Sequence, residues 1–305
     1  MTQLPSPYRA IAPDLRGYGD TEDVQVDATR GMRDFTDDIL ALMDALEIDK
    51  AHFAGHSLGG GALFTLHAYH SGRVQSLTLV NPASPYGFGG TKDVAGNPCW
   101  EDFAGSGGGI VNPEFARLIK ANDRTSDNPQ ASPRVVVNSF YWKPPFVPEN
   151  IEELLDGVLK EKIGDDRYPG DFVASANYPF TAPGQYGPIN ASSPQYIGDS
   201  VARFIRESQK VPVLWVRGSH DQVVANESFF DVGTLGKMGF IPNYPGVETY
   251  PPQPMIDQTR DVLEQYEKQG GTFQEVIMED TGHTPFIEKP QEFMGHFTDW
   301  LKNSD

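Results

Sequence analysis

Apolar residues follow two different periods in the N-terminal part of the chain. Short apolar runs typical of buried strands occur at residues 8–13, 52–55 and 75–81. Between them, residues 33–48 repeat apolar side chains every three to four positions, and residues 58–70 are an alanine- and leucine-bearing segment; each predicts a helix. Because strands and helices alternate, we expect right-handed crossovers and a mostly parallel sheet with helices on both faces, an α/β fold.

The helix predicted at residues 33–48 has one apolar and one acidic face. The apolar face carries Phe35, Ile39, Leu42, Met43 and Leu46. Asp34, Asp37, Asp38 and Asp44 fall on the other face, where we expect them to be in contact with water.

The regular pattern stops after the third predicted strand. Residues 82–210 are rich in proline, glycine and aromatic residues, with short helices expected at 113–122, 149–163 and 195–208. A structureless loop of this length is uncommon in a compact domain. We therefore expect residues 85–208 to form an inserted, mainly helical cap.

The core pattern returns in the last third of the chain. A strand is predicted at residues 211–218, a second insertion at 226–252 and a helix at 255–268. A strand at residues 272–279 and a final helix at 290–301 follow. Residues 1–84 and 209–305 are thus expected to form one core domain.

Composition narrows the classes of partner. Asp and Glu number 42 against 24 Lys and Arg, giving a formal net charge of −18. This charge argues against nucleic acid or an anionic membrane as a partner, because phosphate groups are bound by clustered cations.

With the single cysteine Cys99, no intrachain disulfide can form. No apolar run is long enough for a membrane span, and the start of the sequence does not resemble a signal peptide. We expect a cytoplasmic protein without a metal or other cofactor, since the histidines and the cysteine show no metal-ligand spacing.

The sequence Gly55-His56-Ser57-Leu58-Gly59 lies between a predicted strand and a predicted helix. In this context the pattern G-x-S-x-G is typical of a nucleophilic serine on a sharp turn. The two glycines would avoid collisions with the adjoining elements, and the following helix would direct the Leu58 N–H toward a developing oxyanion.

A nucleophilic serine requires a base and a group that orients the base. Asp221 follows the strand predicted at 211–218, and His283 follows the one at 272–279. The chain order serine, aspartate, histidine is the order expected for this topology. Asp280 is a second candidate for the acid, and His220 is expected beside the site or exposed.

From about Tyr8 to its end, the chain resembles the α/β-hydrolase family. The similar segments are "APDLRGYGDT", "GHSLGG", "LWVRGSHDQVV" and "GHTPFIEKP". The resemblance implies a catalytic triad of Ser57, Asp221 and His283 and no cofactor. Family members that open epoxides or cleave carbon–halogen bonds carry Asp at the nucleophile position, so Ser57 disfavours those reactions. Asn81, where some members place their acid, is an amide, which favours Asp221.

The chain departs from the family pattern at its N-terminus. Members normally have three strands and a helix before the segment "YRAIAPDLRGYG", including a His-Gly loop that supplies a second oxyanion donor. Only about seven residues precede that segment here. We expect upstream sequence to encode the missing strand and loop; otherwise the sheet would begin at its usual fourth strand with an open edge.

These features predict a serine hydrolase that cleaves a carboxylic ester or lactone through an acyl-enzyme. The alternatives are an amide or peptide hydrolase similar to the proline iminopeptidases, and a hydrolase-fold receptor that binds a small ligand without turning it over. Aromatic residues of the cap are candidates for the substrate pocket. Together with His56, they are Trp100, Phe140, Tyr141, Trp142, Phe146 and Phe180.

Overall fold

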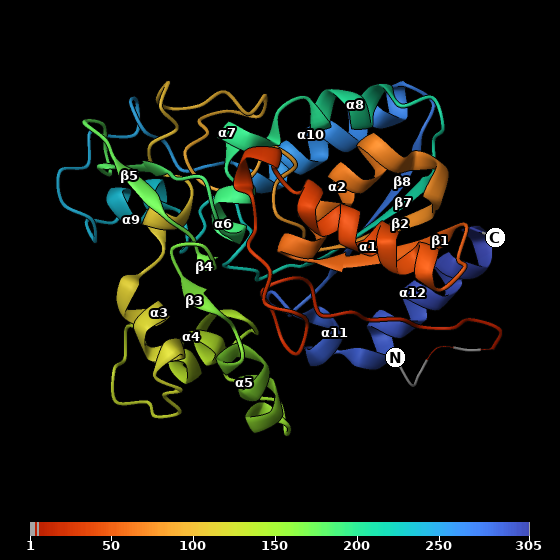
Figure 1. Ribbon diagram of the computed structural model, residues 1–305, viewed down its shortest axis with the longest axis horizontal. Helices are drawn as coiled ribbons and strands as arrows, with labels where there is room; N and C mark the ends of the chain where they lie inside the picture. Colours follow the sequence, from red (N-terminus) through yellow and green to blue (C-terminus); the bar gives the residue numbers. More distant parts are fainter. Residues whose placement is uncertain (1–3, 5, 305) are drawn as a thin grey trace.

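The centre of the molecule is a parallel four-stranded sheet. A computed structural model describes residue 4 and residues 6–304 of the 305-residue chain. The strands are β1 (Ala51–His56), β2 (Val74–Val80), β7 (Pro212–Gly218) and β8 (Thr272–Met278). They pair in the order β1-β2-β7-β8, and each pair is parallel (Figure 1). The predicted α/β architecture is confirmed.

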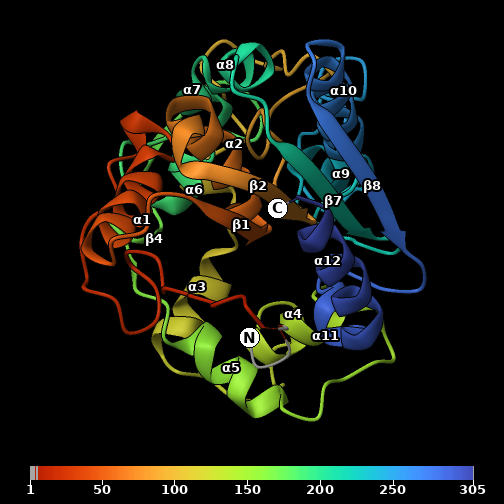
Figure 2. The ribbon, with the colours of Figure 1, turned by 90° about the vertical axis from the view of Figure 1, so that its right-hand side faces the viewer.

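Helices cover both faces of this sheet. α2 (Leu58–His70), α8 (Ser200–Arg206) and α10 (Met255–Lys268) pack on one face, and α12 (Pro290–Ser304) packs on the other (Figure 2). The bounds of α2 and α10 coincide with those predicted from the sequence.

Successive residues of β7 point to opposite faces, as the pleat of a strand requires. Val213 packs with Phe204 of α8 in one apolar cluster. Leu214 and Val216 pack with Phe293 of α12 in the other. Although α8 lies before residue 209, the expected boundary between cap and core, it belongs to the core layer by its packing.

The remaining elements, apart from the helix at Arg33–Ala45, are short and lie mostly in the insertions. They are η1 (Ala28–Arg30), α1 (Arg33–Ala45), η2 (Ser71–Arg73), η3 (Gly108–Ile110), α3 (Pro113–Lys120), α4 (Pro133–Phe140), α5 (Ile151–Leu159), β3 (Ile163–Gly164), β4 (Tyr168–Pro169), β5 (Phe172–Ala174), β6 (Thr181–Pro183), α6 (Pro188–Ala191), α7 (Pro194–Ile197), α9 (Val232–Lys237) and α11 (Pro285–Glu288).

The inserted segment lies to one side of the four-stranded sheet. Helices α3, α4 and α5 group together there, with the small pairs β3–β4 and β5–β6 beside them (Figure 1). The helix predicted at 195–208 is two helices, α7 and α8, because Gly198 between them adopts φ 59°. The sequence pattern missed α4, which begins at Pro133 within a segment without a clear period.

The second insertion packs against the first. Val232, at the start of α9, and Tyr250 share a small apolar cluster with Tyr178 and Trp100. The Tyr178 hydroxyl donates a hydrogen bond of 2.8 Å to the Val232 carbonyl. The two insertions, although distant in sequence, therefore pack together beside the sheet.

Residues 8–13 do not form the predicted strand. Residues 9–13 are exposed, including the apolar Ile11, which is 40 % exposed. A strand is stabilised by a ladder with a neighbouring strand, and no ladder includes residues 9–13 in the described part of the chain. The first strand of the sheet is instead β1, which lies at an edge.

The prediction that Asp34 faces water is wrong. Asp34 is 3 % exposed, and its carboxylate accepts hydrogen bonds from Arg16 Nη1 at 3.0 Å and from the Asp27 N–H at 2.9 Å. Arg30 pairs with its other oxygen. These partners compensate the buried charge, and helical periodicity alone gives no sign of them.

Within the described residues, no helix is long and apolar enough to cross a membrane.

Candidate active site

Ser57 occupies the turn between β1 and α2, in a conformation unusual for a residue with a side chain. Its φ of 54° and ψ of −121° lie outside the regions that L-residues favour, so the turn holds local strain. The Ser57 N–H donates to the Val80 carbonyl at 3.0 Å. Its carbonyl accepts from the N–H groups of Gly61 and Ala83 at 3.0 and 2.9 Å. These bonds tie the strained turn to the end of β2.

Glycines allow the turn to fit between strand and helix. A Cβ on Gly55 would lie 2.6 Å from the Gly59 carbonyl oxygen, and one on Gly60 would lie 2.7 Å from Pro82 Cβ. A Cβ on Gly59 would meet nothing within 4 Å. Of the two glycines expected to avoid a collision, Gly55 does so and Gly59 does not. The second position without room for a side chain is Gly60.

Leu58 is the first residue of α2. Its N–H is thus one of the helix's first four amide groups, which have no acceptor within the helix. The first turn carries no acidic side chain that would compete for these donors. The positive end of the helix dipole and at least one free N–H lie next to Ser57.

Asp221 and His283 are joined by a hydrogen bond at the ends of β7 and β8. His283 Nδ1 lies 2.8 Å from Asp221 Oδ2, and the two side chains are 3 % and 2 % exposed. The other oxygen of Asp221 accepts from the N–H groups of Val223 and Val224 at 2.8 and 3.1 Å. The carboxylate is held in place by its own loop, and its partner Nδ1 carries the proton, which leaves His283 Nε2 as the basic nitrogen.

The His283 carbonyl is held by two side chains. Asn81 Nδ2 donates to it at 2.7 Å, while Asn81 Oδ1 accepts from the Gly218 N–H at 3.0 Å. His56 Nε2 also lies 2.7 Å from the His283 carbonyl oxygen. Burial, and then the charge of His283, lower the pKa of His56 to about 3, so its ring is neutral and donates this bond. We expected His56 to contact substrate, but its ring bonds the backbone of His283 instead.

Glu288 also holds the loop that carries His283, and nothing in the sequence pattern indicates this role. Its carboxylate accepts from the Gly282 N–H and from the Lys143 N–H, each at 2.8 Å. It therefore connects the residue before His283 to the inserted segment. No local pattern distinguishes this acid from others on short helices.

The second acid candidate lies elsewhere. The Asp280 side chain is 66 % exposed and forms an ion pair with Lys143. His220 is exposed, and its ring bonds the Ser219 hydroxyl at 3.0 Å. Only Asp221, of the two carboxylates, bonds His283.

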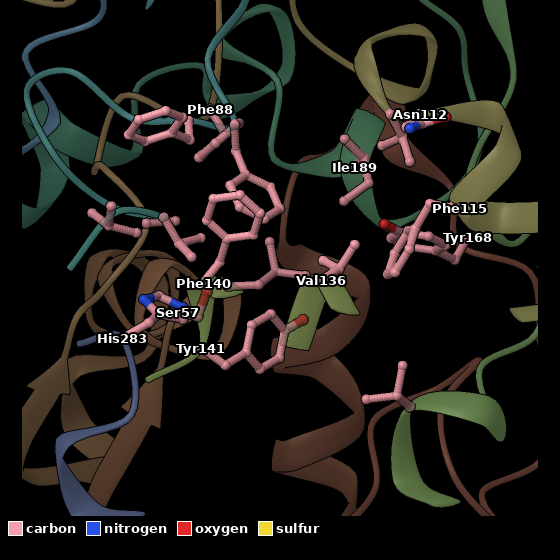
Figure 3. A pocket seen from close by; sticks show the side chains of 18 of the residues that line it. Ser57, Phe88, Asn112, Phe115, Val136, Phe140, Tyr141, Tyr168, Ile189 and His283 are labelled. Carbon is pink, nitrogen blue, oxygen red and sulfur yellow. The ribbon is translucent and has the colours of Figure 1, made fainter. Parts of the chain in front are cut away.

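A cavity of about 710 Å³ opens beside these groups. Ser57, Leu58 and His283 line it together with Phe140 and Tyr141, two of the aromatic residues expected from the sequence (Figure 3). Its size lies in the range of small-molecule sites, and most of its lining is apolar.

The other aromatic candidates do not line this cavity. Trp142 is 2 % exposed and its ring contacts Phe146, with centroids 6.5 Å apart. Trp100 donates from Nε1 to the Tyr178 carbonyl at 2.8 Å, and Phe180 is 46 % exposed. Their apolar surface is used for packing within the insertions or lies at the surface.

Several lining residues have no signal in the sequence pattern, because they come from loops and from both insertions. The apolar ones include Phe88, Phe115, Val136, Ile189, Phe229 and Phe230. The polar ones include Tyr18, Glu161 and Tyr168. The described residues contain no group of three or more His, Cys, Asp or Glu side chains arranged to hold a metal ion.

Comparison with known proteins identifies the family. A model of the alpha/beta hydrolase family matches residues 2–295. The chain belongs to this family. In solved structures, the enol-lactonase of Burkholderia xenovorans LB400 is similar to it, with a TM-score of 0.50 and 20 % identity over 95 % of this chain and 79 % of that one. This likeness supports the alpha/beta hydrolase fold.

Two curated relatives match a shorter stretch of this alpha/beta hydrolase. The 3-oxoadipate enol-lactonase 1 of Acinetobacter baylyi is 36 % identical over 81 residues, 27 % of this chain and 29 % of that protein. The 2-hydroxymuconate semialdehyde hydrolase of a Pseudomonas species is 37 % identical over 83 residues, 27 % of this chain and 29 % of its own. The match thus spans under a third of these relatives.

Proposed function

We propose that the protein is a serine hydrolase that cleaves a carboxylic ester or lactone through an acyl-enzyme on Ser57. The observation that carries the proposal is the placement of Ser57 and His283 on one cavity, with Asp221 bonded to the far nitrogen of His283 at 2.8 Å. This arrangement has the three parts required for nucleophilic catalysis by serine: nucleophile, base and orienting acid.

In the first half of the reaction, Ser57 Oγ attacks the acyl carbon and its proton passes to His283 Nε2. Asp221 holds the imidazole in the required tautomer and stabilises the imidazolium that forms. The Leu58 N–H donates a hydrogen bond to the oxyanion at the start of α2. When the intermediate collapses, the carbon–oxygen bond of the ester breaks and His283 gives the proton to the leaving alcohol.

In the second half, water replaces the alcohol. His283 removes a proton from the water, which attacks the acyl carbon, and the proton then returns to Ser57 Oγ as the carboxylic acid leaves. In a lactone, the alcohol stays attached to the acyl group, so the product is a hydroxy acid. The two halves of the reaction require no oxidant, reductant or cofactor.

Two observations favour esters or lactones over the other substrates of the fold. The nucleophile position carries Ser57 rather than a carboxylate, which disfavours epoxide opening. The comparison proteins include enol-lactonases. We further propose that the segment 85–208, apart from α8, serves as a cap over the cavity.

The test is hydrolysis of a panel of p-nitrophenyl esters, a lactone and an amide by the purified chain and by Ser57→Ala. We expect ester or lactone turnover by the wild type and loss to background in Ser57→Ala. Preferred cleavage of the amide would favour the peptidase alternative. Binding of substrate without turnover would favour the receptor, and unchanged turnover by Ser57→Ala would refute the mechanism.

A further inference from the structure

Four polar side chains gather on the cavity wall, although they come from four separate segments. Tyr18 lies in the turn before α1, Tyr141 follows α4, Glu161 follows α5 and Tyr168 lies in β4. Figure 3 shows Tyr168 across the cavity from Ser57, with Tyr141 between the two. We call these four residues the hydroxyl cluster.

The members of the hydroxyl cluster interact with one another. Tyr18 and Glu161 act on each other: an interaction with the Tyr18 side chain lowers the pKa of Glu161, and Glu161 raises the pKa of Tyr18. Desolvation, followed by the proximity of Glu161, raises the pKa of all three tyrosines, that of Tyr141 to about 12. All three hydroxyls therefore keep their protons and remain donors at neutral pH.

Several cations of the neighbouring elements form ion pairs with carboxylates other than Glu161. The pairs are Lys160 with Asp20, Arg117 with Glu114, Arg124 with Asp156, Arg134 with Glu152, and Arg16 with Asp34 and Asp38. None of them forms an ion pair with Glu161 in the described part of the chain. Desolvation raises the pKa of Glu161 to about 8, and only the interaction with Tyr18 opposes it. At pH 7 this carboxyl group is mostly protonated, so its O–H is a donor for a ligand.

The hydroxyl cluster thus offers several O–H donors in a mostly apolar cavity. A neutral ligand oxygen satisfies them without bringing a charge into a desolvated site. A ligand carboxylate would bring a charge into this desolvated site without a cation to pair with it, and an ammonium group would require Glu161 to lose its proton. A site built to bond an oxygen atom discriminates strongly against an analogue that lacks it, because its polar groups are then left unpaired.

We infer that the hydroxyl cluster is a specificity subsite that binds a neutral oxygen, a ketone, ether or hydroxyl, on the part of the substrate remote from the bond cleaved at Ser57. This inference rests on the proposed function and names its substrate class as oxygenated esters or lactones. Tyr141 connects the two regions: its ring contacts that of His283 edge-to-face at 6.0 Å, and its carbonyl accepts from the Thr284 hydroxyl at 2.7 Å.

The experiment compares p-nitrophenyl 5-oxohexanoate with p-nitrophenyl hexanoate, and 4-oxopentanoate with pentanoate. For the wild type at pH 7, at least one oxo ester should have a KM about tenfold lower than its alkyl partner, the effect of one hydrogen bond. Glu161→Gln, which keeps an N–H donor, should retain this preference. Glu161→Leu should lose it, and Tyr168→Phe should weaken it. The exposed Glu149→Gln is the matched control and should change neither ester.

The pH dependence gives a second readout. As pH rises through about 8, Glu161 ionises and ceases to donate, so the KM of the oxo ester should rise in the wild type and stay level in Glu161→Gln. The alkyl ester should show no such rise. Equal KM values for both oxo–alkyl pairs in the wild type would overturn the inference. So would a wild-type preference for p-nitrophenyl 6-aminohexanoate that Glu161→Gln abolishes. If the wild type hydrolyses the alkyl esters and shows no preference for the oxo esters, the inferred subsite is wrong and the proposed function stands. If the wild type hydrolyses neither kind of ester and a fluorophosphonate does not label Ser57, the proposed function itself is wrong.

Discussion

At the scale of single residues, the sequence revealed those candidate catalytic side chains that follow a predicted strand. Ser57, Asp221 and His283 follow three predicted strands whose carboxyl ends meet at one edge of a parallel sheet. Glu288 and Glu161 could not be found in this way, since what distinguishes each is its position beside segments far away in the chain. Their acidic side chains resemble the many exposed carboxylates of a chain with 42 acidic residues.

The role proposed for Asp221 predicts a large effect of a small substitution. Asp221→Asn keeps the shape of the side chain but favours the wrong tautomer of His283, so kcat for a good ester should fall by about 10⁴-fold. Steady-state kinetics measures this. The exposed Asp280→Asn is the matched control and should stay within a few-fold of wild type. A larger loss in Asp280→Asn than in Asp221→Asn would show that the acid was assigned wrongly.

At the scale of elements, the sequence pattern predicted the bounds of some helices well, and tertiary pairing overrode it elsewhere. α2 and α10 begin and end at the residues predicted from the sequence. Residues 8–13 have the composition of a strand but form no ladder, and the helix predicted at 195–208 breaks at Gly198. The packing of the turn at Ser57 was only partly predictable, because the sequence shows that glycines are present but not what each one approaches.

The glycines at the start of α2 therefore differ in their tolerance of a side chain. Gly60→Ala places a methyl group 2.7 Å from Pro82 Cβ, and we expect a loss of about 1–3 kcal/mol in the free energy of unfolding. Gly59→Ala meets nothing within 4 Å and should be neutral or stabilise the helix by up to about 1 kcal/mol. Urea unfolding of both variants measures the difference. Equal destabilisation by the two substitutions would contradict this packing.

At the scale of the whole molecule, the sheet holds the candidate residues and the insertions form the opposite wall of the cavity. The family and the α/β class were predictable from four motifs in order. The cavity was not, because its lining combines loops, the helices α3, α4 and α5, and residues after β7, whose side chains meet only in the folded chain. The distribution of buried ionisable groups was likewise hidden in the sequence.

One buried group, His67, makes stability depend on pH. Burial lowers its pKa from 6.5 to about 4, so between these values the unfolded chain binds a proton that the folded chain does not. The contribution of His67 to stability is complete above about pH 6.5 and is lost as pH falls toward 4. Glu161, with its raised pKa, has the opposite sign, but it is common to the variants compared.

Replacing His67 by Gln should therefore make the acid side of the stability profile less steep. Between pH 6.5 and 4, the slope of unfolding free energy against pH should fall by up to about 1.4 kcal/mol per pH unit relative to wild type. Urea unfolding at a series of pH values measures the slopes. The exposed His296→Gln should leave the wild-type slope unchanged, and an unchanged slope in His67→Gln would contradict the buried neutral imidazole.

The central claim is that Ser57 is the nucleophile, and covalent labelling tests it most directly. The wild-type chain is treated with a fluorophosphonate, and the adduct is located by mass spectrometry of its peptides. We predict one phosphonyl group per chain, on Ser57, with no adduct in Ser57→Ala and a much slower reaction in His283→Ala. An adduct on another serine, or full labelling of Ser57→Ala, would contradict the account.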